Sequence, residues 1–175
     1  MARLKLSNIK EFKGKEKVLY ETFPSNLINA MLTYAPTQVE SYEGLGSSFR
    51  KGVLNSKERE FIICRVAYLS NSDYEIMQHY EIAKSGGVTK EELHAVKTGK
   101  TDLLTDKSAV LLKFVDETIL NVQCSKQTFS DMQHYFNDKE IGESLLLIGH
   151  YMMTARFLRG LDVDLDESPT SWDRM

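Results

Sequence analysis

The chain has 175 residues, of which 42% are hydrophobic and 27% are charged, and its formal net charge is −3. This length fits one domain, predicted over residues 1–175, that can bury a sizeable core without a disulfide or a structural metal. The near-neutral charge argues against a nucleic-acid binder, which usually carries a strongly basic face.

The termini and cysteines indicate a compartment. No apolar run approaches the ~20 residues of a membrane span, and residues 1–17 are rich in lysine, so we expect neither a membrane anchor nor a signal peptide. Cys64 and Cys124 lie far apart in the sequence. We expect them to be reduced, buried thiols in a cytoplasmic protein.

The chain is predicted to be all-α, a single helical bundle, because residues 37–168 contain no proline and hydrophobic residues recur at helical spacing. Residues 1–17 are predicted to be an N-terminal arm. Ser25 can cap a helix that ends near Ala35, before Pro36, and a second helix follows at about 37–52. Further helices are predicted at about 55–69, 72–85, 89–98, 105–121, 125–135 and 138–161, followed by a tail at about 162–175. Several of these starts have a capping pair, such as Asn55 with Glu58.

Glu60 is the first candidate for chemistry, because helical spacing places it on the same face as Ile63, Cys64 and Ala67. A carboxyl group on an apolar face should have a raised pKa, which suits proton transfer near neutral pH. The structural alternative is a glutamate at the edge of the core that pairs with an arginine, such as Arg65 or Arg159.

The next helix carries Ser72, Glu75 and His79 on one face, with Glu75 and His79 four residues apart. A carboxylate beside an imidazole is an acid–base couple in which the glutamate can orient the ring. Alternatively, Glu75 completes a capping box with Ser72, and His79 is an exposed ring. The local spacing of histidines and cysteines that marks a zinc site is missing, so no metal is predicted.

The remaining candidate residues are predicted to bind a ligand rather than to take part in a reaction. His150 lies in an apolar run and is either a core histidine or a member of a pocket, and Tyr74 can offer a phenol to a substrate or simply pack. Asp162, Asp164 and Asp166 imitate the start of a calcium loop, but Glu167 stands where the loop needs glycine.

A longer stretch of sequence indicates a family. From Arg59 the chain reads REFIICRVAYLSNSDYEIMQHYEIAKSGG, followed by VTKEEL. This resembles the carboxymuconolactone decarboxylase family and is similar to the related alkylhydroperoxidase D-like proteins. The residues that carry the resemblance are Arg59-Glu60, Tyr74-Glu75, His79, Ala83, Gly86-Gly87, Thr89 and Glu92-Leu93. A looser likeness covers Ser25–Pro36 and Leu145–Glu167.

The resemblance implies which residues act. Peroxidase-type members have a glutamate, a CxxC pair and a histidine; here Glu60 and His79 match, but the cysteine positions fall on Ser72 and Glu75. A serine cannot form sulfenic acid or a disulfide, so thiol peroxidase chemistry at this site is excluded. Decarboxylase-type members have a glutamate at the second position, which Glu75 matches. By this analogy His79 donates a proton, Glu75 orients it, and Glu60 exchanges the proton or binds a polar group of the substrate.

We therefore expect an enzyme that needs no cofactor, a lyase or isomerase acting on a small carboxylated or lactone-like compound. His79, Glu75 and Glu60 are predicted to be catalytic, and Tyr74, Ser72 and His150 to bind the substrate. One alternative is a non-catalytic protein that binds a small ligand or builds an assembly on the same scaffold; another is a peroxidase-related protein without thiol peroxidase activity. The family resemblance also implies a homo-oligomer, commonly a trimer or hexamer.

Overall fold

The computed structural model describes residues 2–170, and α-helices make up most of this part of the chain. The all-α prediction is confirmed. The helices are α1 (Gly14–Thr22), α2 (Asn26–Tyr34), α3 (Val39–Ser48), α4 (Ser56–Leu69), α5 (Asp73–Ser85), α6 (Lys90–Thr98), α7 (Asp106–Asn121), α8 (Lys126–Tyr135) and α9 (Asp138–Leu161). Two short 3-10 helices, Ile9–Glu11 and Phe49–Lys51, complete the described elements.

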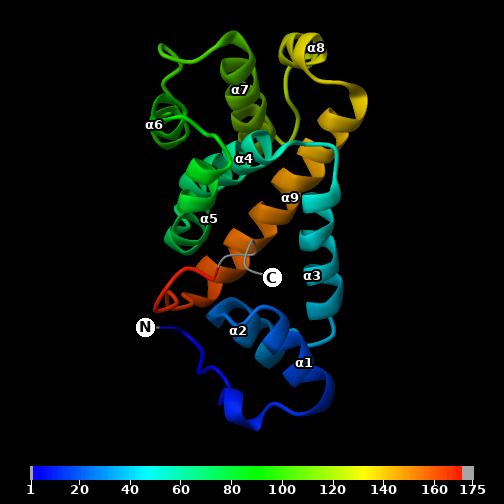
Figure 1. Cartoon of the computed structure of the whole chain (residues 1–175), viewed down its shortest axis with the longest axis vertical. Helices are drawn as coiled ribbons and strands as arrows, with labels where there is room; N and C mark the ends of the chain where they lie inside the picture. The colour runs from blue at the N-terminus through cyan, green and yellow to red at the C-terminus, as the bar shows by residue number, and fades with distance from the viewer. Residues whose placement is uncertain (1, 171–175) are drawn as a thin grey trace.

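Helix α4 is the centre of the bundle, in contact with α5, α6, α7 and α9. Its residues from Glu60 to Ala67 are all buried, because neighbouring helices cover it on several sides. Figure 1 shows α6, α7 and α8 at one end of the molecule and α1 and α2 at the other, with α9 running between them. A polar residue in this stretch of α4 is therefore held inside the protein.

The hydrophobic side chains form two clusters rather than one. The larger cluster joins residues of α4, α6, α7, α8 and α9. The smaller cluster joins residues of α2 and α3 with Tyr74 of α5 and Leu158 of α9. The candidate site described below is lined by residues of both clusters.

Side chains close the helix ends as the sequence indicates, with one exception. Thr89 and Glu92 form a complete capping box at the start of α6, and Asn55 accepts a hydrogen bond from the Glu58 amide. The capping box expected from Ser72 and Glu75 is wrong, because the Ser72 side chain makes no capping hydrogen bond. The Glu75 carboxyl group is consequently not used to cap α5.

The two terminal segments lie against the bundle. Residues 14–22 form α1, so the last residues of the arm predicted at about 1–17 are helical. In the C-terminal segment, the Asp166 carboxylate accepts hydrogen bonds from the Asn26 amide at 2.7 Å and from Gln78 Nε2 at 2.9 Å. Residues up to 170 therefore join α2 to α5, and the rest of the predicted tail lies outside the described residues.

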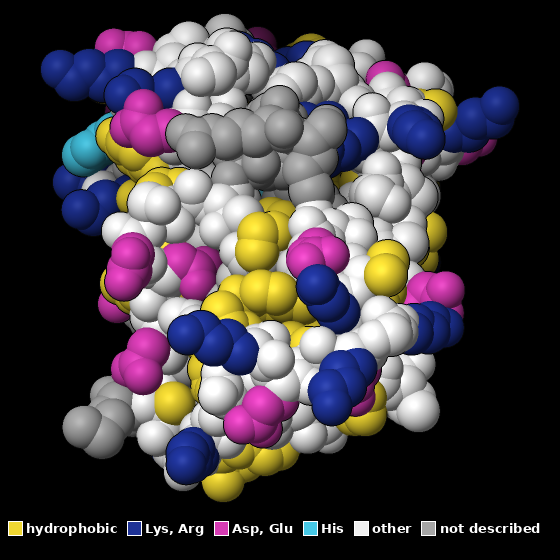
Figure 2. All heavy atoms as spheres, turned by 60° about the horizontal axis from the view of Figure 1, so that its bottom comes forward, with side chains coloured by type: hydrophobic (Ala, Val, Ile, Leu, Met, Phe, Trp, Pro, Cys, Tyr) yellow, Lys and Arg dark blue, Asp and Glu magenta, His cyan; other side chains and the backbone are white. Residues whose placement is uncertain are grey.

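The surface does not show a dominant charge on the face seen in Figure 2. Lysine, arginine and acidic side chains are interspersed there around hydrophobic patches. None of the helices within residues 2–170 combines the length and the hydrophobicity needed to cross a membrane.

Candidate active site

A buried cavity lies where α3, α4, α5 and α9 meet the end of α2. It is lined by Phe23, Leu27, Tyr42, Gly46, Phe49, Arg50, Arg59, Glu60, Tyr74, Glu75, Gln78, His79, Ile82, His150, Tyr151 and Thr154. The space open to the centres of water molecules is about 40 Å³, whereas one water needs roughly 10–15 Å³. The cavity therefore has room for a few waters or one compact small molecule.

Glu60 lies at the wall of this cavity as an ionised carboxylate. Its side chain comes from the buried face of α4, and the residue is 2% exposed. Oε1 accepts a hydrogen bond from Arg59 Nε at 3.1 Å, and Oε2 lies 2.9 Å from His79 Nδ1. Burial alone raises the pKa of Glu60, but the interactions with His79 and Arg59 outweigh it, so that the pKa is lowered.

His79 is oriented by this carboxylate. It lies on α5 and is buried. An ionised carboxylate only accepts hydrogen bonds, so Nδ1 is the nitrogen that donates to Glu60. The ring also packs edge-on against Tyr151, with the ring centroids 5.0 Å apart. These two contacts fix the ring and leave Nε2 as the nitrogen for proton transfer.

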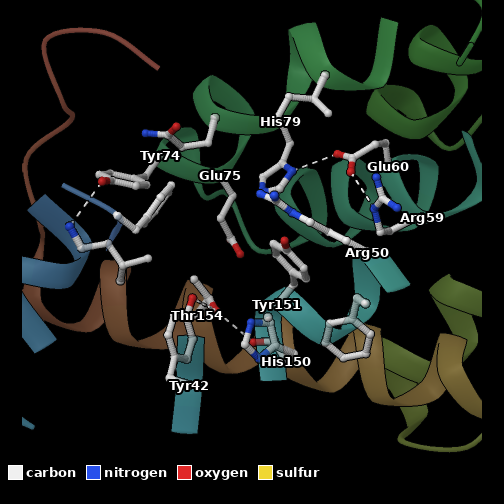
Figure 3. Close-up of a pocket in the computed structure, with 16 residues that line it drawn as sticks. Tyr42, Arg50, Arg59, Glu60, Tyr74, Glu75, His79, His150, Tyr151 and Thr154 are labelled. Atoms are coloured by element: carbon white, nitrogen blue, oxygen red, sulfur yellow. Dashed lines mark hydrogen bonds and ion pairs between the residues drawn. The ribbon is translucent and has the colours of Figure 1, made fainter. Parts of the chain in front are cut away.

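Glu75, unlike Glu60, is a buried carboxyl group that no neighbouring charge within residues 2–170 stabilises in its ionised form. Its carboxyl group points into the cavity (Figure 3), the residue is 2% exposed, and neither carboxyl oxygen has a hydrogen-bond partner within the described structure. Burial raises the pKa of Glu75 to about 8. The Ser72 hydroxyl lies close enough to offset part of that rise, although its geometry makes no hydrogen bond. Glu75 therefore keeps its proton at neutral pH.

The predicted roles of the two glutamates change as a result. The expectation that Glu75 orients His79 is wrong, because the imidazole bonds to Glu60 instead. The alternative in which Glu60 pairs with an arginine is confirmed, but the partner is Arg59 rather than Arg65 or Arg159; Arg65 pairs with Asp116. Glu60 is the orienting carboxylate, and Glu75 is a neutral acid on the same cavity. Two carboxyl groups with opposite protonation states are a common arrangement in acid–base enzymes.

His150 lies on the α9 side of the cavity. Its ring stacks on Tyr42, with the centroids 4.7 Å apart, and its Nδ1 has no hydrogen-bond partner in the described part of the chain. A Cβ at Gly46 would lie 3.3 Å from His150 Nε2, so the glycine lets α3 approach the ring closely. Burial, and after it the charge of His79, lowers the pKa of His150 to about 4. The ring is neutral at physiological pH.

The other two predicted binding residues are placed differently. Tyr74 lines the cavity, but its hydroxyl donates to the Asp166 carboxylate and accepts from the Leu27 amide at 3.2 Å, so it is already occupied. Ser72 is buried and does not line this cavity; it borders a neighbouring hollow next to Leu158. Neither hydroxyl is free to meet a molecule in the cavity.

Sequence reasoning missed Tyr151, Arg59 and the pair formed by Tyr42 and Thr154. The Tyr42 hydroxyl and Thr154 Oγ1 are 2.9 Å apart, and the Thr154 hydroxyl donates to the His150 carbonyl at 2.9 Å. The signal for Tyr151 was its position next to His150 in a strongly apolar helix. A partly buried tyrosine there brings a hydroxyl that needs a polar neighbour.

Redox and metal chemistry have few candidate groups. Cys64 is buried on α4, where burial and then the Glu60 charge raise the pKa of its thiol, and neither Cys64 nor Cys124 forms a disulfide. Within residues 2–170, no group of three or more histidine, cysteine, aspartate and glutamate side chains is placed to hold a metal ion.

The fold is similar to that of alkylhydroperoxidase D-like helical proteins. A peroxidase-related protein from Ralstonia eutropha with an alkylhydroperoxidase core has a TM-score of 0.77 at 14% identity, over 95% of this chain and 93% of that one. A peroxidase-related protein from Silicibacter has a TM-score of 0.74 at 16% identity, over 95% of this chain and 92% of that one. The debrominase Bmp8 has a TM-score of 0.71 at 15% identity, over 95% and 91%.

Residues 39–108 match the carboxymuconolactone decarboxylase family. The match confirms the predicted resemblance, and the matched segment contains Glu60, Glu75 and His79. The comparison with curated proteins gives no match.

Proposed function

We propose that the protein is an acid–base enzyme, a lyase or isomerase that acts on a small carboxylated or lactone-like compound and needs no cofactor. The observation that carries this proposal is the difference between the two buried glutamates of one cavity. Burial raises the pKa of Glu75, whereas the contacts with His79 and Arg59 lower the pKa of Glu60. Environments that separate the pKa values of neighbouring acids assign them different tasks.

In the proposed reaction His79 moves the proton. If the substrate loses carbon dioxide, the bond to its carboxyl carbon breaks and the electron pair remains on the substrate as a carbanion or dienolate. His79, protonated at Nε2, then donates that proton to the carbon. Glu60 holds the ring in position throughout and stabilises its positive charge, as its hydrogen bond to Nδ1 allows.

The cavity supports a small substrate. It is enclosed largely by buried side chains, so water is limited and electrostatic interactions inside are strong. Arg59 and Arg50 both line it and provide positive charge near a carboxylated molecule. The family match supplies carboxymuconolactone as the first compound to test.

The experiment follows loss of carboxymuconolactone and release of carbon dioxide with the purified protein. We expect His79→Ala to abolish turnover and Glu75→Gln, which keeps a neutral donor but loses the acidic proton, to lower it, while the helical circular dichroism spectrum is retained. His94→Ala and Glu81→Gln are the matched controls, because both residues are exposed on α6 and α5. Unchanged turnover in both site variants contradicts the proposal, and stabilisation by the lactone without product indicates a binding protein instead.

We also propose a homo-oligomer, a trimer or hexamer. Leu145 and Leu146 of α9 are 41% and 63% exposed, although the helix packs its other face into the bundle. Exposed leucines on a core helix are natural interface residues. Light scattering that finds only a monomer at micromolar concentration contradicts this proposal.

A further inference from the structure

Three tyrosines line the cavity, and their hydroxyl groups are in different states. The Tyr42 hydroxyl pairs with Thr154, and the Tyr74 hydroxyl pairs with Asp166. The Tyr151 hydroxyl has no hydrogen-bond partner among the described residues, and it points into the cavity (Figure 3). Tyr151 is thus the tyrosine whose hydroxyl can meet a bound molecule.

The ring of Tyr151 is held firmly. It packs edge-on against His79 at 5.0 Å and against His150 at 5.3 Å between centroids, and it belongs to the long helix α9. Burial, followed by the negative charge of Glu60, raises the pKa of Tyr151 well above its ordinary value. The group therefore remains a neutral phenol, which can donate a hydrogen bond.

The Glu75 carboxyl group faces the same space. It points toward the part of the cavity into which the Tyr151 hydroxyl projects (Figure 3), and its oxygens have no hydrogen-bond partner among residues 2–170. A protonated carboxyl group is a donor as well. Two uncharged donors without partners, held on two different helices, converge on one small buried volume. Such donors are strongest toward an oxygen that becomes negative during a reaction.

We infer that Tyr151 and Glu75 form an oxyanion-binding pair, which stabilises the enolate-type oxygen of a small carbonyl compound while His79 transfers the proton at carbon. This inference rests on the proposed function and narrows its substrate to compounds that pass through an enolate or dienolate. When His79 Nε2 takes a proton from the carbon next to the carbonyl, the electron pair moves to the carbonyl oxygen. The oxygen accepts hydrogen bonds from Tyr151 and Glu75, and return of the proton to carbon regenerates the carbonyl group without oxidation or reduction.

The inference can be tested by binding, without a known substrate. 4-Nitrophenolate carries an oxyanion on a single ring and changes its absorbance when it gains a proton; nitrobenzene has the same ring without the oxyanion. We expect Tyr151→Phe to weaken binding of the phenolate about tenfold or more, the loss typical of a hydrogen bond to a charged group. Binding of nitrobenzene should stay unchanged in the same variant.

Tyr80→Phe is the matched control, since Tyr80 is next to His79 in sequence but is exposed on α5. Its phenolate affinity should equal that of the wild type. Three results overturn the inference: a wild-type protein that binds no phenolate, a Tyr151→Phe variant with unchanged phenolate affinity, or equal weakening for nitrobenzene.

The same variants separate this inference from the proposed function. Phenolate binding that depends on Tyr151 supports the oxyanion pair even when the protein does not consume carboxymuconolactone. In that case the oxyanion pair stands, and a different substrate must be found for the proposed reaction. Conversely, if turnover depends on His79 but is as fast in Tyr151→Phe as in the wild type, the acid–base function stands and the oxyanion pair is refuted. A selective decrease of kcat with an unchanged KM in Tyr151→Phe supports stabilisation of a transition state.

Discussion

Replacing Glu75 with glutamine should stabilise the protein, and the gain should increase with pH. In the unfolded chain this carboxyl group has its ordinary pKa of 4.5, whereas in the folded protein burial raises the pKa to about 8. Between these values the folded state holds a proton that the unfolded state has released. Stability is therefore complete below pH 4.5 and decreases as the pH rises toward 8.

The magnitude follows from the separation of the two pKa values. Each pH unit between them is worth ~1.4 kcal/mol, so the free energy of unfolding at pH 7 is lowered by about 3 kcal/mol relative to acidic pH. Glutamine has the same shape without the titration, so Glu75→Gln avoids this loss. For a domain of this size, about 3 kcal/mol corresponds to a rise in Tm of roughly 6–12 °C.

Equilibrium urea unfolding of the wild type and Glu75→Gln at pH 5, 6, 7 and 8 measures the effect. The difference in the free energy of unfolding should grow over this range, while Glu81→Gln, on the exposed face of the same helix, should give a small and nearly constant difference. A pH-independent difference for Glu75→Gln refutes the reasoning, because it would mean that Glu75 is ionised in the folded protein.

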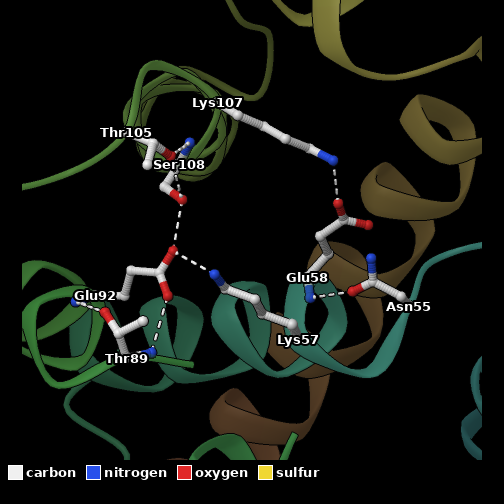
Figure 4. A network of polar contacts seen from close by, with 8 residues as sticks. All are labelled: Asn55, Lys57, Glu58, Thr89, Glu92, Thr105, Lys107 and Ser108. Carbon is white, nitrogen blue, oxygen red and sulfur yellow. Dashed lines mark hydrogen bonds and ion pairs between the residues drawn. The ribbon is translucent and has the colours of Figure 1, made fainter. Parts of the chain in front are cut away.

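Three further substitutions probe other contacts. Glu60→Gln should destabilise the protein by about 3 kcal/mol at pH 7, because it leaves Arg59 and His79 without their carboxylate; the destabilisation, measured by urea unfolding, should shrink as the pH falls and Glu60 is protonated in the wild type. Glu92→Ala should lower stability by about 2 kcal/mol in the same assay without changing turnover, since Glu92 closes the α6 capping box and accepts from Ser108 in the network of Figure 4. Val122→Gly should raise Tm, because Val122 has φ +66°, a left-handed conformation that costs a β-branched residue about 1 kcal/mol; an unchanged or lower Tm would contradict this.

The helices could be predicted from sequence because their starts are set by local chemistry. Ser125 and Thr89 each accept a hydrogen bond from the amide three residues later, as their positions indicate. The sequence did not predict helix α1, because the local signals are weak there. None of its residues is buried, so hydrophobic spacing gives no signal, and it depends on contact with α2.

Sequence reasoning could predict that Glu60, Glu75 and His79 lie together, but it could not predict how they pair. Spacing on a single helix makes Glu75 and His79 neighbours, and it cannot weigh that pairing against a carboxylate from another helix. The packing of α4 against α5 determines which glutamate pairs with His79, because it brings the Glu60 carboxylate to the imidazole. Tyr151 is separated from His79 by most of the C-terminal half of the chain, so its hydroxyl could be placed only by the tertiary fold.

The cavity draws its walls from beyond the family segment. Residues 39–108 supply Glu60, Glu75 and His79, whereas Leu27, His150 and Tyr151 come from the flanking helices. Asp166, near the end of the described chain, ties α2 to α5 beside the same space. The residues proposed to transfer the proton thus come from the family segment, whereas part of the cavity wall, with the proposed oxyanion donor Tyr151, comes from outside it. Exchanging α2 with that of a structural relative should change which compounds enter and keep Glu60, Glu75, His79 and Tyr151 in place.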